Sequence, residues 1–98
     1  MKPTSHVTVV RLYASLREPA GERHVDVALP DGAIIRDLLN RLVELRPSLA
    51  ERLLEQDGNI PRSVNVFVNG RDIRYLNGLD TPITPHDEVT ILPPVAGG

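Results

Sequence analysis

The chain has 98 residues, enough for one domain with a single hydrophobic core, and its hydrophobic content of 41% is ordinary for a globular protein. It contains no cysteine, which excludes disulfides, thiolate zinc sites and a cysteine nucleophile. A formal net charge of -2 with scattered arginines argues against nucleic acid as a partner, because binding to its phosphates needs a clustered basic surface.

The sequence also argues against a membrane protein. No apolar run approaches the roughly 20 residues that span a bilayer. The first residues, "MKPTSHVTVV", lack the apolar core of a signal peptide. We therefore expect a cytoplasmic protein without a membrane partner.

The first part of the chain alternates as strands do. In residues 6–16 apolar and β-branched residues share one face at Thr8, Val10 and Leu12, and the other face carries Val9, Arg11 and Tyr13. After a turn at Pro19 and Gly21, residues 23–29 alternate again, with Val25, Val27 and Leu29 inward. The two segments predict an antiparallel hairpin.

Residues 31–47 change to a helical period, with one apolar stripe at Ile35, Leu38, Leu39, Leu42 and Leu45. Asp31 is the expected start signal, and Pro47 is expected to end the helix because the residue before a proline avoids helical angles. Ser48 and Glu51 have the spacing of a capping box, which predicts a short second helix through Leu54.

The second half returns to strands. Residues 63–70 place Val64, Val66 and Val68 inward and end in Asn69-Gly70, a favoured hairpin turn. Residues 71–76 are expected to form a short return strand, and a proline-containing segment then crosses to a last strand at 88–92. In that strand Val89 and Ile91 point inward, and Thr90 and Leu92 point outward.

This order predicts an α+β domain in which a mixed sheet of about five strands wraps one main helix, with a short second helix. No repeat or low-complexity tract divides the chain. We expect the domain to cover residues 1–92 and an extended, flexible tail to cover 93–98.

Catalytic motifs are not recognised in the sequence. It has no glycine-rich phosphate loop, zincin helix or nucleophile elbow, and its histidines at positions 6, 24 and 86 are isolated. Asp87 and Glu88 are neighbours, but adjacent residues of a strand point to opposite faces, so we interpret them as a polar end of the last strand. We therefore predict no catalytic residue, no metal site and no bound cofactor.

The tail "PPVAGG" is the most informative stretch. A frayed end is the simplest interpretation. However, Pro93 and Pro94 favour a stiff, extended path, and the six residues after Leu92 reach at most roughly 20 Å. Gly97 and Gly98 have no side chain, so the terminal carboxylate could enter a narrow channel in another protein.

Outward apolar residues predict a docking surface for that other protein. Tyr13, Phe67 and Leu92 lie opposite the core on strands expected to be neighbours, with Arg11 and Arg74 at the rim. The alternative is that single exposed apolar side chains are ordinary on protein surfaces.

Three stretches resemble the small sulfur-carrier proteins of the ubiquitin-like, β-grasp type. They are "LYASLRE" at 12–18, "VNVFVNGRDIRYLNGL" at 64–79 and "DEVTILPPVAGG" at 87–98. This family includes the small subunit of molybdopterin synthase, the thiamine sulfur carrier and a cysteine-biosynthesis sulfur carrier. The chain is most similar to the last of these types.

The resemblance implies a carrier rather than an enzyme. An E1-like adenylyltransferase and sulfurtransferase would adenylate the Gly98 carboxylate with ATP, and a sulfur donor would convert it to a thiocarboxylate. The residues that thread into this partner would be Pro94, Val95, Ala96 and Gly97. The sulfur would pass to an acceptor synthase, either cysteine synthase-like or the large subunit of molybdopterin synthase. The resemblance also implies a further partner, a JAMM-type metalloprotease that would trim the tail.

Other functions remain open at this point. The chain could be a protein modifier attached to lysines through Gly98, or a subunit of molybdopterin synthase itself. It could also be a plain interaction module whose tail is inert. The receiving pathway is open as well.

Overall fold

The computed structural model describes residues 5–12, 23–55, 57, 59–61, 64–84 and 86–92. Its strands and helices, in chain order, are β1 (Ser5–Leu12), β2 (His24–Pro30), α2 (Ile35–Leu45), α3 (Ala50–Leu53), β3 (Asn65–Val68), β4 (Arg71–Asp72) and β5 (Glu88–Leu92). Short 3-10 turns lie between them, at η2 (Pro47–Leu49), η3 (Ile73–Tyr75) and η4 (Gly78–Asp80).

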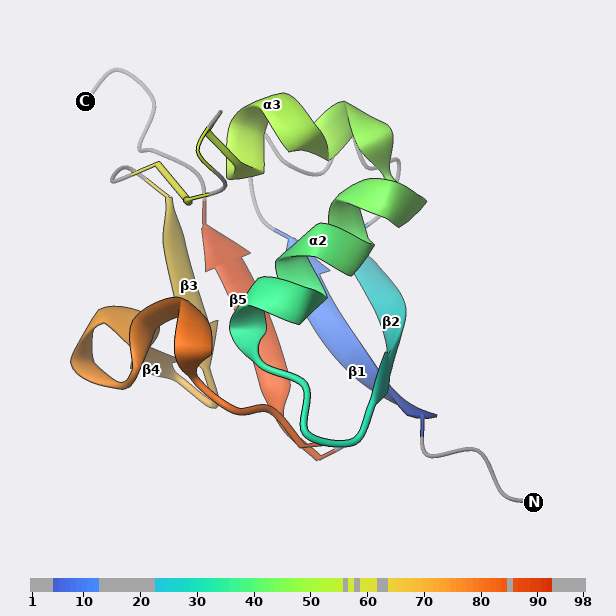
Figure 1. Ribbon diagram of the computed structural model, residues 1–98, viewed down its shortest axis with the longest axis vertical. Helices are drawn as coiled ribbons and strands as arrows, with labels where there is room; N and C mark the ends of the chain where they lie inside the picture. The colour runs from blue at the N-terminus through green and yellow to red at the C-terminus, as the bar shows by residue number, and fades with distance from the viewer. Residues whose placement is uncertain are drawn as a thin grey trace.

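The strands form one mixed sheet in the order β2-β1-β5-β3-β4. β1 and β5 are parallel, and the other neighbouring pairs are antiparallel. α2 lies across one face of this sheet, and the short α3 follows it (Figure 1). The prediction of a five-stranded sheet wrapping one main helix, with a short second helix, is confirmed.

The core lies between α2 and the inner face of the sheet. The apolar stripe of the helix is buried at Ile35, Leu38, Leu39 and Leu42, as its spacing predicted. The inward residues of β1, β2, β3 and β5 meet it, and they include Val10, Val27, Val66 and Ile91. Burying a side chain of this size contributes about 1.5–3 kcal/mol, so this alternation fixes which face of each strand is outward.

α2 begins later than the sequence indicated. Asp31 and Gly32 form a turn, in which Gly32 has a φ of +82°, and the cap is at Ile34. The capping carboxylate belongs to Asp37, whose Oδ2 accepts a hydrogen bond from the Ile34 N–H at 3.0 Å. The end of the helix is as expected, because Arg46, just before Pro47, is no longer helical.

The predicted capping box at Ser48 is wrong. Residues 47–49 form a 3-10 turn instead, and α3 begins at Ala50 with Leu49 as its cap residue and no side-chain capping bond. Leu49 and Leu53 are both fully buried. The packing of these two leucines therefore positions the short helix, and a side-chain cap does not.

The hairpin between β3 and β4 turns as expected, with positive φ at both Asn69 (53°) and Gly70 (+85°). The return strand is much shorter than predicted. It ends at Asp72, whose Oδ1 accepts a hydrogen bond from the Arg74 N–H at 2.9 Å and so starts the 3-10 turn η3. The backbone N–H of Arg74 thus bonds to the Asp72 side chain, and β4 ends after two residues.

The segment from Thr81 to Thr84 crosses beneath α2, as its prolines suggested. The Thr81 carbonyl accepts from the Ile35 N–H at 2.9 Å, and the Ile83 N–H donates to the Ala33 carbonyl at 3.0 Å. These bonds join the start of α2 to the approach of β5. β5 itself lies in the middle of the sheet, where it pairs with β1 and β3.

Asp87 precedes β5 rather than belonging to it, and it ties that approach to the hairpin. Its Oδ1 accepts from Asn69 Nδ2 at 2.7 Å and its Oδ2 from the Thr84 N–H at 2.8 Å. Burial would raise the pKa of Asp87, but these hydrogen bonds, with a smaller contribution from His86, outweigh it and hold that pKa below its ordinary value.

Candidate functional site

The candidate site is the sheet surface opposite α2, which we call the outer face. Strand alternation gives it the residues that are not in the core. On the three adjacent strands β1, β5 and β3 these are Val7, Val9 and Arg11 on β1, Glu88, Thr90 and Leu92 on β5, and Asn65 and Phe67 on β3.

The strand register brings predicted docking residues together. Thr90 is the register partner of both Arg11 on β1 and Phe67 on β3, so these three form a row across the outer face. Leu92 is paired with Asn65, which makes Leu92 and Phe67 diagonal neighbours across the β3–β5 pair. Diagonal side chains lie within reach of an aromatic ring, and both of these are half-buried.

Arg11 is held by an ion pair on this surface. Its Nε lies 2.6 Å from Oε2 of Glu88, and the two side chains are 52% and 51% exposed. The pair crosses from β1 to the start of β5. Arg11 thus lies in the same row as Phe67, and its guanidinium is paired with the carboxylate of Glu88 at the start of β5.

Arg74 reaches the outer face from η3. Its guanidinium donates to Oδ1 of Asn65 and, at 3.0 Å, to the carbonyl of Val64, and it lies 3.5 Å from Asp72. Asn65 is the register partner of Leu92. The structure therefore places Arg74 at the β3 side of the outer face, next to Asn65.

Two apolar residues of the outer face were missed by the sequence-based prediction. Val7 and Val9 are 51% and 37% exposed on β1, on the same side as Arg11. The alternation of β1 already placed Val9 outward, so the signal was present. The sequence did not show which strand lies next to Val9, because only the sheet order shows that β1 lies beside β5.

Tyr13 and the tail residues Pro94, Val95, Ala96, Gly97 and Gly98 lie outside the described residues. The structure does define the strand that leads to the tail. β5 is the central strand of the sheet and ends at Leu92, and Ile91 is paired with Leu12 at the end of β1. β5 thus ends at Leu92 between its neighbours β1 and β3.

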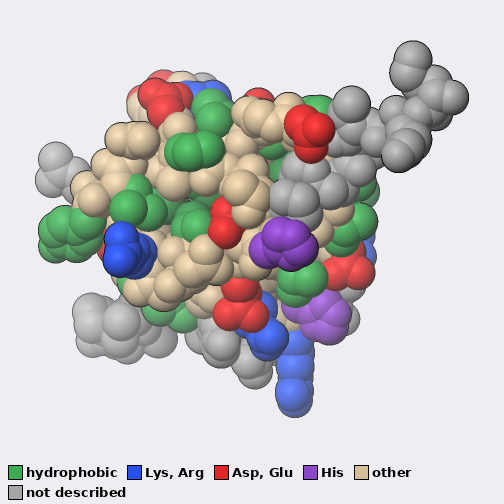
Figure 2. Space-filling view, turned by 90° about the horizontal axis from the view of Figure 1, so that it is seen from below, with side chains coloured by type: hydrophobic (Ala, Val, Ile, Leu, Met, Phe, Trp, Pro, Cys, Tyr) green, Lys and Arg blue, Asp and Glu red, His purple; other side chains and the backbone are tan. Residues whose placement is uncertain are grey.

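The described chain offers little else that resembles a site for chemistry. His24 and His86 are exposed, and no group of three or more metal-ligating side chains occurs within the described ranges. On the face seen in Figure 2, acidic and basic side chains are interspersed among hydrophobic ones. Among the described residues, every helix is too short or too polar to span a bilayer.

A mixed five-stranded sheet that wraps one main helix and has its last strand at the centre is the ubiquitin-like β-grasp fold. The sequence model of the ThiS family matches residues 10–98, and the chain belongs to this family of small ubiquitin-like sulfur carriers.

Known relatives and solved structures agree with this membership. The chain is 38% identical over 89 residues to small archaeal modifier protein 3 of Haloferax volcanii, covering 91% of this chain and 96% of the relative. It is 44% identical over 69 residues to the sulfur carrier protein CysO of Mycobacterium tuberculosis, covering 68% and 70%.

Among solved structures, SAMP1 of Haloferax volcanii has a TM-score of 0.86 at 34% identity and covers 94% of this chain and 99% of that one. The Amycolatopsis orientalis BexX/CysO complex contains a chain with a TM-score of 0.79 at 30% identity, covering 93% and 99%. Both likenesses extend over nearly the whole fold.

Proposed function

We propose that this protein is a sulfur carrier whose reactive group is the carboxylate of Gly98. The observation that carries the proposal is the position of β5. The central strand of a family-typical β-grasp sheet delivers the chain at Leu92, and the sequence then continues as Pro-Pro-Val-Ala-Gly-Gly. A family member named as a sulfur carrier supports this assignment.

The proposed chemistry takes place in two steps on the partner enzyme. The Gly98 carboxylate attacks the α-phosphorus of ATP and pyrophosphate leaves, which turns a poor electrophile into an acyl adenylate. Hydrosulfide from a sulfur donor then attacks the acyl carbon, AMP leaves with the electrons of the broken acyl–oxygen bond, and the thiol proton is released. The product is a thiocarboxylate, which is ionised at neutral pH and can transfer its sulfur to an acceptor.

The outer face is the proposed docking surface for the activating enzyme. Phe67 and Leu92 form its apolar part, and Val9 extends it along β1. Arg11 and Arg74, each already anchored to a neighbouring residue, would flank it. Aromatic residues and arginines are the side chains most enriched at the energetic centres of protein interfaces. Tyr13 is proposed to belong to the same surface.

The test of the proposed function is the intact mass of the protein purified from its native host. Exchange of one oxygen for sulfur at the C-terminus adds about 16 Da. We expect this species in the wild type and not in a variant that lacks Gly98, which serves as the control. If each protein has the mass calculated for its own unmodified chain, under conditions in which sulfur transfer is active, the proposal is contradicted.

A second candidate is a protein modifier joined to lysines through Gly98. It is favoured by the relative named as a modifier, which covers nearly the whole chain. Both candidates need an activated C-terminus, and they differ in the acceptor. Digestion of proteins from the native host would reveal peptides branched at lysine if the modifier function holds, and the absence of any branched peptide would exclude it.

A further inference from the structure

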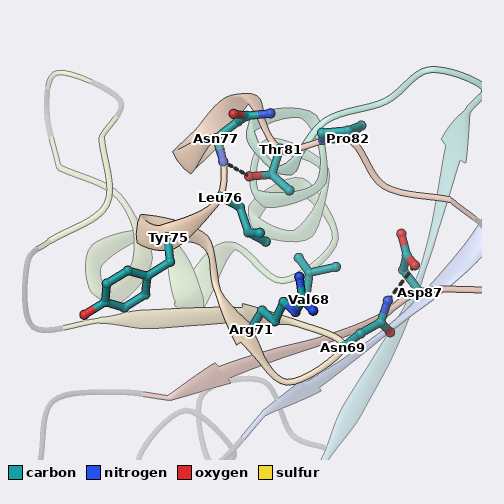
Figure 3. A pocket seen from close by; sticks show the side chains of 9 residues that line it. All are labelled: Val68, Asn69, Arg71, Tyr75, Leu76, Asn77, Thr81, Pro82 and Asp87. Carbon is teal, nitrogen blue, oxygen red and sulfur yellow. Dashed lines mark hydrogen bonds between the residues drawn. The ribbon is translucent and has the colours of Figure 1, made fainter.

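A second surface lies away from the outer face, at the edge of the sheet formed by β4. It is an open groove of about 720 Å³ between the β3–β4 hairpin, η3 and the segment that follows η4. Val68 lies at its base, and Tyr75, Leu76 and Arg71 are among its walls (Figure 3). The groove is separate from the proposed docking residues, because Phe67 and Val68 are adjacent in β3 and point to opposite faces.

The apolar side chains of this groove are unusually open to water. Tyr75 is 87% exposed and Leu76 is 36% exposed, and the ring of Tyr75 projects away from η3 (Figure 3). Tyrosine supplies a large contact area and loses little side-chain entropy on binding. The groove also contains Arg71, and tyrosine and arginine are both enriched at the energetic centres of protein interfaces.

The polar groups of the groove decide what it could hold. The Arg71 guanidinium makes no hydrogen bond or ion pair within the described part of the chain, so its five donors are free. The carboxylate of Asp87, at the other end, already accepts from Asn69 and Thr84. Among the described residues Arg71 therefore has no paired anion, because Asp87 is engaged at the other end of the groove, and a carboxylate of a ligand can pair with Arg71.

The openness of the groove favours a polypeptide over a small molecule. Pockets for small ligands enclose most of the ligand surface, commonly 70–90%. Here the principal aromatic wall is itself almost fully exposed at 87%, so a small ligand would remain in water. A peptide segment can lie along such a surface and be held by a few contacts.

We propose that this groove binds a linear peptide segment of a partner protein that carries a carboxylate next to an apolar side chain. The carboxylate pairs with Arg71, and the apolar side chain packs between Tyr75 and Leu76. The inference does not depend on the chemistry of Gly98. Because the groove and the outer face lie on opposite sides of β3, both can be occupied at once.

The experiment begins with selection of random linear peptides on the full-length protein. The selected peptides are then titrated into the ¹⁵N-labelled protein, and backbone amide shifts are followed by NMR. We expect sequences enriched in Asp or Glu beside apolar residues, with shifts at Arg71, Tyr75 and Leu76. Failure to select peptides, absence of the acidic preference, or shifts confined to the outer face would each overturn the proposal.

Variants separate the role of Arg71 from a general effect of charge. Arg71→Glu should weaken binding of the selected peptide by at least about tenfold, and Tyr75→Ala by a similar factor. Arg52→Glu makes the same charge change on α3 and should leave the affinity within about twofold. Equal losses for Arg52→Glu and Arg71→Glu would overturn the proposal.

Two further measurements address the alternatives. ATP is titrated as a representative anionic small molecule, and shifts at Arg71 and Tyr75 comparable to those caused by the peptide would reassign the groove to nucleotides. Phe67→Asp should leave peptide affinity unchanged, because its side chain is on the other face. Loss of peptide binding in a folded Phe67→Asp variant would show that the peptide occupies the outer face instead.

Discussion

Phe67 and Val68 are consecutive residues of β3 that serve opposite sides of the sheet. Phe67 is half-buried on the outer face beside Leu92, and Val68 is 7% exposed at the base of the β4-edge groove. The pleat of one strand thus separates two surfaces at which proteins could bind.

Because the two surfaces lie on opposite sides of β3, a substitution on one surface should impair only the binding that takes place there. Phe67→Asp should abolish adenylation by the activating enzyme, because it places a charge in the apolar part of the docking surface. Tyr75→Asp is the matched control, an aromatic-to-aspartate change in the groove, and should be adenylated normally. Formation of the acyl adenylate measures both. Normal adenylation of a folded Phe67→Asp protein would remove the outer face from the proposal.

The ion pair between Arg11 and Glu88 should contribute little to stability. Both side chains are about half exposed, and pairs of this kind contribute about 0.2–1 kcal/mol. We expect a coupling free energy of that size from urea denaturation of Arg11→Gln, Glu88→Gln and the double variant. A coupling free energy above about 2 kcal/mol would contradict this view of the pair.

A pair of buried threonines offers a sharper test of the core. Thr8 is fully buried and its hydroxyl has no hydrogen-bond partner among the residues that the structure describes. Thr81 is also buried, but its hydroxyl accepts from the Asn77 N–H at 3.1 Å and donates to the Gly78 carbonyl at 2.7 Å.

The same substitution should therefore have opposite effects at these positions. Thr8→Val removes an unsatisfied hydroxyl and should leave the free energy of unfolding unchanged or raise it by about 1 kcal/mol. Thr81→Val should lower it by about 0.5–1.5 kcal/mol, because it removes the partner of the Asn77 N–H and one of the two hydrogen bonds to the Gly78 carbonyl, which still accepts from the Thr81 N–H. Chemical denaturation measures both, and equal losses would disprove the distinction.

Asp87 should make stability depend on acid pH. Its native pKa is lowered from the ordinary value of 3.8, by hydrogen bonds that outweigh the opposing effect of burial. A carboxyl group of this kind stabilises the fold above its unfolded pKa, and the contribution is lost as the pH falls through the native pKa.

The measurement compares wild type with Asp87→Asn. The wild type should be more stable at neutral pH by about 1–3 kcal/mol, the usual value for hydrogen bonds to a charged group. The difference should shrink as the pH falls below about 4. A difference that stays constant down to pH 2 would show that the charge of Asp87 plays no part.

Much of the fold could be read from short-range pattern. Burial of apolar side chains sets the two-residue alternation of β1, β2, β3 and β5 and the helical stripe of α2. All five elements are present in the structure with the predicted residues inward. The turn at Asn69 was equally local, because the residue pair Asn-Gly tolerates positive φ. The "PPVAGG" ending and the family resemblance likewise needed only the sequence.

The errors lay at the ends of elements, where side-chain hydrogen bonds and the packing of single residues decide the boundary. The cap of α2, the start of α3 and the length of β4 were decided by Asp37, by burial of Leu49 and by the Asp72 cap, none of which hydrophobic periodicity registers.

Which residues share the outer face was likewise settled by tertiary structure. The parallel pairing of β1 with β5 brings Arg11 beside Glu88, with which it forms an ion pair although the two residues are 77 positions apart in the chain. The groove at β4 arose from the same cause, since its walls come from a hairpin, a 3-10 turn and a crossing segment. A sequence determines which side of each element is apolar, but only packing determines which sides become neighbours.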